Sequence, residues 1–276
     1  MPGDADIAAV GALLGDRART RILAALGDGR ALAASQLAVE AGVAASTASE
    51  HLARLVDGGL LACERHGRHR YYRIAGPDVA GLLEAMARLA PPAPVASLRE
   101  GTKAHALRVA RTCYDHLAGQ VGTGLMAAMI DTGLIAGGDG VYHPRAARDD
   151  RLSAFGRDVD YVLTDRGAGV LAGLGVDLDG AASSRRPFVR YCVDWSEQRH
   201  HLAGALGAAV HARFVELGWI RPQPQGRAVW LTPAGARGLE DAFRFAPDAA
   251  WVHRPARVAS RLPRPGSRAA SRRSRR

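Results

Sequence analysis

Apolar residues recur at helical spacing in three consecutive segments near the start of the chain, 16–29, 34–42 and 44–61. Within the first and third segments they lie three or four positions apart, which places them on one face of a helix. In the second segment Leu37 and Val39 are expected to face inward. Gly42 separates the second segment from the third and predicts a tight turn between two short helices. The outer face of the third segment carries small polar residues, so another surface can approach it closely. This pattern predicts a helix-turn-helix, whose second helix suits the major groove of DNA.

A basic hairpin is predicted directly after the third helix. LLACE and RYYRI have the composition of strands, and the turn between them, RHGRH, is polar and contains a glycine. Arginines on such a hairpin favour contact with the DNA backbone or the minor groove, as a wing makes. The side chains expected to face DNA lie on the third helix and on this hairpin: Ser46, Thr47, Ser49, His51, Arg54, Arg65, Arg68, Arg70 and Tyr72.

The rest of the chain contains an internal repeat. HLAGQVGTGLMAAMIDTGLI begins at His116 and HLAGALGAAVHARFVELGWI begins at His201, and each is followed by a strand-like segment that closes in Leu-Thr-x-x-Gly. A repeated unit of this kind predicts two winged-helix-like units that pack as a pseudo-symmetric pair. The predicted fold class is therefore mainly α with small β-hairpin wings (α+β), with an N-terminal winged helix-turn-helix followed by two repeated winged-helix-like units.

Changes in composition suggest where the segments begin and end. The proline-rich stretch LAPPAPVASLREG separates the helix-turn-helix from the repeat, and the formal net charge of +10 is concentrated in nine arginines after Val252. We expect this tail to be disordered, and either to keep the protein in solution or to bind DNA phosphates without sequence preference. The predicted ranges are 1–90 for the DNA-binding domain, 91–103 for a linker, 104–248 for the effector or interaction domain and 249–276 for the tail.

Several classes of protein are excluded by composition. No run of eighteen apolar residues occurs, so we expect neither a membrane span nor a membrane partner. The first sixteen residues are acidic and contain no basic residue, unlike a secretory signal. Three cysteines, an odd number, do not form a disulfide framework. These features predict a cytoplasmic protein with reduced thiols.

The segments DRARTRILAAL, ASQLAVEAGVAASTASEHLARLVDGGLL and GRHRYYRI resemble the ArsR/SmtB family of winged-helix repressors. The resemblance implies a homodimer that binds a palindromic double-stranded DNA operator and leaves it when an effector binds. It also implies that the first helix and the helix at 79–89 form the dimer contact. Many relatives carry a Cys-x-Cys metal site where this chain has Ala33 and Ser35. We therefore expect the effector site in the repeat region, 104–248.

The pattern Cys-x-Asp followed by His-Leu-Ala-Gly occurs twice, once at the start of each repeat. Two units that pack through equivalent faces bring equivalent residues together, and two thiolates with two imidazoles suit zinc or another metal or metalloid. The spacing of the first pair predicts that Cys113 and His116 share one helical turn. The predicted ligands are Cys113, His116, Cys192 and His201, with Asp115 and Asp194 as additional ligands or as carboxylates that orient the imidazoles.

Two other interpretations of the repeated pattern are open. Asp115 and Asp194 are good helix N-caps and cysteines pack well in cores, so the repeat would then preserve only capping and packing. Alternatively, Cys113 and Cys192 form a redox pair that oxidation bridges or that a reactive sulfur species modifies.

Cysteine, histidine and aspartate are also the components of a nucleophilic triad, which an enzyme would use. The chain has no nucleophile elbow and no glycine-rich phosphate loop after a strand, so we do not expect an enzyme. The sequence thus predicts a DNA-binding transcriptional repressor that releases its operator on sensing a metal, a metalloid or a thiol-reactive signal. The alternative is a regulator without a metal that responds to thiol redox or to a small molecule.

Overall fold

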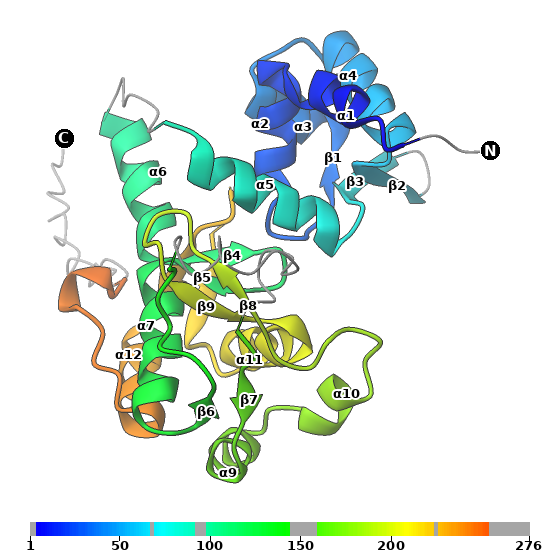
Figure 1. Cartoon of the computed structure of the whole chain (residues 1–276). Coiled ribbons are helices and arrows are strands. Elements are labelled where there is room, and N and C mark those ends of the chain that lie inside the picture. The colour runs from blue at the N-terminus through cyan, green and yellow to red at the C-terminus, as the bar shows by residue number, and fades with distance from the viewer. Residues whose placement is uncertain (1–3, 67–68, 92–97, 144–158, 224–225, 254–276) are drawn as a thin grey trace, which may run out of the picture.

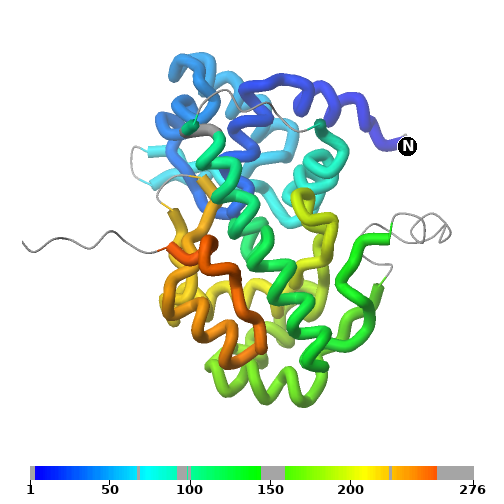
Figure 2. Tube along the Cα trace, turned by 90° about the vertical axis from the view of Figure 1, so that its left-hand side faces the viewer, coloured from blue at the N-terminus to red at the C-terminus, as the bar shows by residue number. Residues whose placement is uncertain are grey.

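The computed structural model consists of two lobes, which Figures 1 and 2 show from two sides. It describes residues 4–66, 69–91, 98–143, 159–223 and 226–253. The first lobe, at the top of Figure 1, ends at residue 91, and the second lobe lies beneath it. Among the described helices, none combines the length and the apolar character that crossing a membrane requires.

The first lobe is a winged helix-turn-helix. Its helices are α1 (Ile7–Leu14), α2 (Arg17–Ala25), α3 (Ala34–Ala41), α4 (Ala45–Asp57) and α5 (Pro77–Leu89). Its strands β1 (Leu32–Ala33), β2 (Leu61–His66) and β3 (His69–Ile74) form an antiparallel sheet in the order β1–β3–β2. Apolar faces of α2, α3 and α4 form the core of the lobe, as predicted. Val39 of α3 is the exception, because it was expected to face inward and is 81% exposed.

The predicted helix boundaries of the first lobe are confirmed by their caps. Asp16 accepts hydrogen bonds from the N–H groups of Ala18 and Arg19, both at 2.9 Å, and so begins α2. Gly42 has φ of 72°, the left-handed conformation that ends α3 before the turn to α4. Helix α5 packs its inner side on this core and runs between the two lobes.

The second lobe contains short hairpins and helices in two similar series. Its helices are α6 (Leu98–Val109), α7 (Gly119–Asp131), α9 (Asp165–Gly173), α10 (Leu178–Ala182), α11 (Gly204–Glu216), α12 (Pro233–Phe243) and the 3-10 helix η1 (Ala249–Trp251). Its strands are β4 (Arg111–Cys113), β5 (His116–Ala118), β6 (Ile135–Ala136), β7 (Val162–Leu163), β8 (Arg190–Val193), β9 (His200–Ala203), β10 (Ile220–Pro222) and β11 (Val229–Leu231). These strands form four antiparallel pairs, β4 with β5, β6 with β7, β8 with β9 and β10 with β11.

The repeat predicted from the sequence is present in the fold. One unit runs β4, β5, α7, β6, β7, α9, and the other runs β8, β9, α11, β10, β11, α12. The last helix of each unit begins in the same way, because Thr164 accepts from the Gly167 N–H and Thr232 accepts from the Gly235 N–H, both at 3.0 Å. Apolar side chains from both units form one shared core.

The predicted local structure at the start of each unit was wrong. A helix was expected from His116 with Asp115 as its N-cap, whereas His116 lies in strand β5 and Asp115 lies in the turn before it. Gly119 has φ of 79°, which breaks the chain direction, so α7 begins only there. Gly204, with φ of 78°, does the same before α11. Cys113 and His116 therefore do not share a helical turn.

The expected linker, 91–103, and the expected tail, 249–276, are both partly structured. Helix α6 begins at Leu98, inside the range 91–103 that was expected to be a linker. Of the expected tail at 249–276, the first residues form η1, and Trp251 and Val252 pack against the core of the second lobe. The arginines of the tail lie outside the described residues.

Candidate functional site

Each repeated unit begins with a hairpin that places a cysteine directly opposite a histidine. Cys113 of β4 pairs with His116 of β5, and Cys192 of β8 pairs with His201 of β9. Side chains directly opposite each other on neighbouring strands lie on the same face of a hairpin. The interval from Cys192 to His201 is longer than that from Cys113 to His116 because the turn of the second hairpin is longer. The two pairs therefore have the same local geometry.

The two Cys–His pairs face each other across a pseudo-two-fold axis. A Cβ atom at Gly122 would lie 3.7 Å from the Cβ of His201, and one at Gly207 would lie 3.3 Å from the Cβ of His116. The rings of His116 and His201 stack, with centroids 5.2 Å apart and an interplanar angle of 29°. The glycines themselves are required by the hairpin of their own unit, since the same Cβ atoms would lie 2.5 Å from the carbonyl oxygen of Leu117 and 2.7 Å from that of Leu202.

The four side chains meet at one place, which we name the Cys–His cluster: Cys113, His116, Cys192 and His201. One potential ligand atom from each of them lies within 4.8 Å of the other three. Three of the side chains are buried and that of Cys192 is partly exposed. The sequence thus predicted correctly which residues would meet, although it placed one pair on the wrong element.

The two histidines have similar surroundings. Nδ1 of His116 lies 3.2 Å from a carboxylate oxygen of Asp115, and Nδ1 of His201 lies 3.5 Å from one of Asp194. The second contact has an ion-pair distance without the alignment of a hydrogen bond. Nε2 of both rings is buried and has no hydrogen-bond partner among the described residues. A carboxylate at one ring nitrogen and an unpartnered second nitrogen are typical of metal-binding histidines.

Burial and proximity change the acidity of the cluster. A hydrogen bond with Cys192, together with burial, raises the pKa of the Cys113 thiol to about 12. Burial lowers the pKa of His116, but the neighbouring Cys113 and Asp115 outweigh it and raise that pKa to about 9. Both shifts favour the protonated forms, so a cation that binds these atoms has to displace protons.

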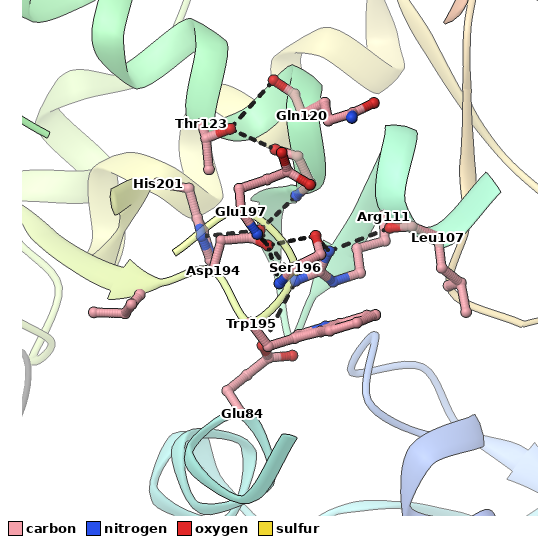
Figure 3. Close-up of polar contacts among 12 residues, drawn as sticks. Glu84, Leu107, Arg111, Gln120, Thr123, Asp194, Trp195, Ser196, Glu197 and His201 are labelled. Atoms are coloured by element: carbon pink, nitrogen blue, oxygen red, sulfur yellow. Dashed lines mark hydrogen bonds and ion pairs between the residues drawn. The ribbon is translucent and has the colours of Figure 1, made fainter. Parts of the chain in front are cut away.

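Asp194 accepts more hydrogen bonds than the other carboxylates near the cluster (Figure 3). It accepts from the Gly119 N–H at 2.7 Å and from the N–H and Oγ of Ser196 at 2.9 and 2.8 Å. It was expected to cap the helix of its own unit, but it caps the N-terminus of α7 in the other unit instead. Burial raises the pKa of Asp194, but Arg111 and His201 lower it well below its usual range, so the carboxylate is ionised.

Arg111 is a fully buried cation that connects Asp194 to the first lobe (Figure 3). Its Nη2 atom lies 3.0 Å from Asp194 and 3.7 Å from Glu84 of α5. Glu84 also pairs with Arg227 at 2.8 Å. Burial raises the pKa of Glu84, but Arg227 and Arg111 lower it below its usual range. Arg111 and Arg227 were not predicted as site residues, because nothing local in the sequence distinguishes them from exposed arginines.

The turn of the first hairpin also contacts the first lobe. Tyr114 donates its N–H to the carbonyl of Gly27 at 2.8 Å, with φ of 58°. A Cβ atom at Gly29 would lie 2.5 Å from the Tyr114 carbonyl oxygen, so this contact needs a glycine. Because Tyr114 stands between Cys113 and His116, the hairpin that carries half of the cluster ends against the turn after α2.

The predicted DNA contacts on α4 lie on its outer face. Four of them are exposed: Ser46, Thr47, Ser49 and Arg54. His51 is only partly exposed, and its Nε2 lies 3.9 Å from a carboxylate oxygen of Asp16. The Ser49 hydroxyl donates back to the carbonyl of Ala45 at 2.9 Å, which leaves its oxygen free to accept.

The wing presents two arginines side by side. Arg65 of β2 is directly opposite Arg70 of β3, and both are exposed. Like charges directly opposite each other destabilise a hairpin, and an anion such as a phosphate relieves the repulsion. The expectation for Tyr72 was wrong, because its side chain is only 6% exposed and belongs to the core beside Ile74. Arg68 lies outside the described residues.

Comparisons with known proteins agree with this architecture. A helix-turn-helix domain family (HTH_20) matches residues 14–64. YdfF of Bacillus subtilis (strain 168), an uncharacterised HTH-type transcriptional regulator, is 38% identical over 235 residues, which cover 85% of this chain and 96% of that protein. The HTH-type transcriptional regulator Rv0324 of Mycobacterium tuberculosis is 42% identical over 76 residues, 28% of this chain and 33% of that protein.

The chain therefore belongs to the HTH-type transcriptional regulators, which are DNA-binding proteins and not enzymes. Its first lobe is a winged helix-turn-helix. Solved structures also match about a third of the chain. The homodimeric winged helix-turn-helix DNA-binding domain of a possible ArsR-family regulator from Mycobacterium bovis is 37% identical, with a TM-score of 0.28, and covers 32% of this chain and 88% of that one. The antimony-specific transcriptional repressor AntR is 31% identical, with a TM-score of 0.28, and covers 30% and 76%.

Proposed function

We propose that the chain is a cytoplasmic transcriptional repressor that binds an operator as a homodimer and releases it when a metal, a metalloid or a thiol-reactive signal reaches the Cys–His cluster. The observation that carries this proposal is the convergence of two equivalent Cys–His pairs whose Nε2 atoms are buried and have no hydrogen-bond partner in the part of the chain that the structure describes. Buried polar atoms without partners are costly, and a bound cation removes that cost.

The DNA-binding part of the proposal rests on the outer surface of the first lobe. Small polar side chains on α4 allow it to approach base edges, and Arg65 and Arg70 on the wing suit phosphates. For the dimer, α1 and α5 carry large apolar side chains in solvent, since Ile7 is 79% exposed and Leu89 is 88% exposed. A second copy of the chain would cover these residues.

A second candidate function uses the same two sulfur atoms without a metal. The hydrogen bond between the Cys113 and Cys192 thiols places them close to each other. A peroxide could oxidise them, with two thiols giving up two electrons and two protons to form one disulfide while the peroxide is reduced to water. A bridge between the two units would then be the signal.

The proposal is tested with full-length protein purified without chelator and DNA from upstream of its own gene. Metal content by mass spectrometry and a thiol count establish what the protein carries. Zinc and arsenite are the two probes. Effector coupling is typically about 1–3 kcal/mol, so the ion that binds the cluster is expected to weaken operator binding by about five- to a hundredfold. Linkage is reciprocal, so operator DNA is expected to weaken binding of the ion by the same factor.

Serine variants identify which thiols matter. Cys113→Ser and Cys192→Ser are expected to retain operator binding and to lose the response, because the thiolate ligand is lost while the side-chain volume is nearly kept. Cys63→Ser is the matched control, since that thiol is exposed on β2 of the wing. A full response in both cluster variants would contradict the proposal. Release caused by peroxide, reversed by dithiothreitol and independent of added metal, would favour the redox candidate.

A further inference from the structure

The charged groups around the Cys–His cluster, which are buried or partly buried, balance one another. Three carboxylates pair with three guanidinium groups: Asp194 with Arg111 at 3.0 Å, Glu84 with Arg227 at 2.8 Å, and Asp115 with Arg186. Arg111 also lies 3.7 Å from Glu84, so two of these pairs are joined. The surroundings of the cluster are therefore close to neutral, which leaves the ligands themselves to decide its net charge.

Two further groups near the cluster do not alter this balance. His211 is hydrogen-bonded to Thr112 at 3.2 Å, and burial lowers its pKa to about 4, so its ring is uncharged at neutral pH. Arg88 donates to the carbonyl of Val193 at 3.4 Å, and its side chain is partly exposed, so solvent screens its charge.

The ligands contribute two negative charges when they bind an ion. Two thiolates carry one charge each, and two imidazoles that bind through Nε2 carry none. A net charge is expensive in a buried site. A divalent cation brings the cluster to neutrality, whereas a trivalent ion would leave one positive charge.

The number of thiols points in the same direction. Trivalent arsenic and antimony prefer three thiolates, and the chain contains only three cysteines. The third, Cys63, is exposed on the wing and is not part of the cluster. The remaining donor set of two sulfurs and two imidazole nitrogens suits tetrahedral Zn(II).

We propose that the Cys–His cluster binds one divalent cation of the Zn(II) class, held by both sulfurs and both Nε2 atoms, and that it discriminates against trivalent arsenic and antimony. This inference rests on the proposed effector function and narrows its ligand. Asp115 and Asp194 act as positioning residues, because each places a carboxylate beside Nδ1 of one ring and so favours binding of the ion through Nε2. The contact is a hydrogen bond at His116 and an ion-pair contact at His201.

The test uses full-length protein stripped of metal with a chelator and kept reduced. Titration with Co(II) is expected to saturate at one equivalent per chain, with a thiolate-to-cobalt charge-transfer band and the intense visible absorption of tetrahedral cobalt. Zn(II) is expected to displace Co(II) and remove the spectrum, and an excess of arsenite is expected to leave the spectrum unchanged. Weak, octahedral cobalt absorption without a thiolate band would overturn the proposal, as would displacement of Co(II) by arsenite.

Variants assign the spectrum to these residues. Cys113→Ser and His201→Gln are expected to abolish the tetrahedral spectrum, whereas Cys63→Ser retains it. Asp194→Asn is expected to retain the thiolate band with weakened affinity, by about ten- to a hundredfold, because the ligands remain and only their orientation is lost. Circular dichroism of each variant shows whether it is folded. A full tetrahedral spectrum in folded Cys113→Ser would contradict the assignment.

Operator binding separates this inference from the function on which it rests. If arsenite binds and releases the operator while Zn(II) does neither, the effector function stands and the divalent assignment is wrong. If Co(II) and Zn(II) bind as described but operator affinity is the same with and without them, the ligand class stands and the effector function is wrong.

Discussion

The guanidinium of Arg111 lies 3.7 Å from the carboxylate of Glu84, and this buried ion pair joins the two lobes. The same guanidinium lies 3.0 Å from Asp194, whose carboxylate is 3.5 Å from Nδ1 of His201. A continuous series of charged contacts therefore runs from the Cys–His cluster to helix α5. A shift of His201 on binding an ion would alter the electrostatic environment of that helix.

Glu84→Gln is expected to reduce the factor by which zinc weakens operator binding. The neutral amide removes the charge through which α5 is joined to Arg111, and residues on such a connection modulate coupling by about 0.5–2 kcal/mol. Operator affinity measured with and without zinc gives this factor. Glu40→Gln is the matched control, because its ion pair with Lys103, at 3.4 Å, also joins the lobes but is exposed. An unchanged factor in folded Glu84→Gln would show that this connection does not transmit the signal.

Ser49→Ala and Arg54→Ala are each expected to weaken operator binding by about 1–3 kcal/mol if these exposed side chains of α4 contact bases. Fluorescence anisotropy at one fixed salt concentration measures the effect. Arg237→Ala on α12 removes an exposed positive charge from the other lobe and should bind normally. Operator binding at full strength by the double variant would place the recognition surface elsewhere.

A chain truncated after His253 is expected to bind all DNA sequences more weakly and with a flatter dependence on salt. The truncation removes nine arginines and keeps the ring of His253, which stacks on Trp230 at 4.4 Å. Each phosphate contact that is lost reduces the logarithmic salt slope by about 0.9. Binding constants measured over a range of salt test this. An unchanged slope with an altered operator preference would mean that the tail is not an electrostatic arm.

Gly122→Ala and Gly207→Ala are each expected to lower stability by about 1–3 kcal/mol and to weaken binding of Co(II). The added Cβ would lie 2.5 Å from the carbonyl oxygen of Leu117 or 2.7 Å from that of Leu202, so a hairpin has to move. Urea denaturation measures the loss. The control is Gly169→Ala on α9, where a Cβ meets open space and should raise stability by about 0.5–1 kcal/mol. Equal stability of all three variants would contradict this close approach.

His211 is expected to make the protein less stable as the pH falls from about 6.5 toward about 4. Burial, with a contribution from the charge of His116, lowers its folded-state pKa to about 4, although Asp115 acts in the opposite direction. In this range the unfolded chain binds a proton that the folded chain does not, so stability falls. His211→Gln should flatten this dependence while keeping a polar contact to Thr112. Urea midpoints across the range test it, and parallel curves for the two proteins would contradict it.

The helix-turn-helix could be predicted because its signals are local. Asp16, Gly42 and the apolar faces of α2 to α4 act within a few residues of where they stand. Tyr72 could have been placed correctly as well, because side chains two positions apart in a strand share a face, and its neighbour Ile74 is apolar. The error came from treating the wing as a basic surface only.

The hairpins of the second lobe could not be predicted in the same way. Strands of three residues are too short to show alternation, and the helix begins at a glycine whose positive φ the sequence does not reveal. The meeting of the four cluster residues was predictable because it follows from the repeat alone. The ion pair of Arg111 with Glu84 depends on how the lobes pack, and its one signal was an acid, Glu84, in the middle of helix α5.

The two Cys–His pairs come from two copies of one unit within a single chain. A protein with one copy of the unit would contain one Cys–His pair and would need a second molecule to complete the cluster. Its apparent affinity for an ion would then depend on the protein concentration. The tandem arrangement removes that dependence, and a few molecules in a cell would respond to an ion as a concentrated solution does. Any pairing of whole chains on DNA still follows mass action. Binding of an ion by the Cys–His cluster is thus independent of the protein concentration, whereas pairing of whole chains depends on it.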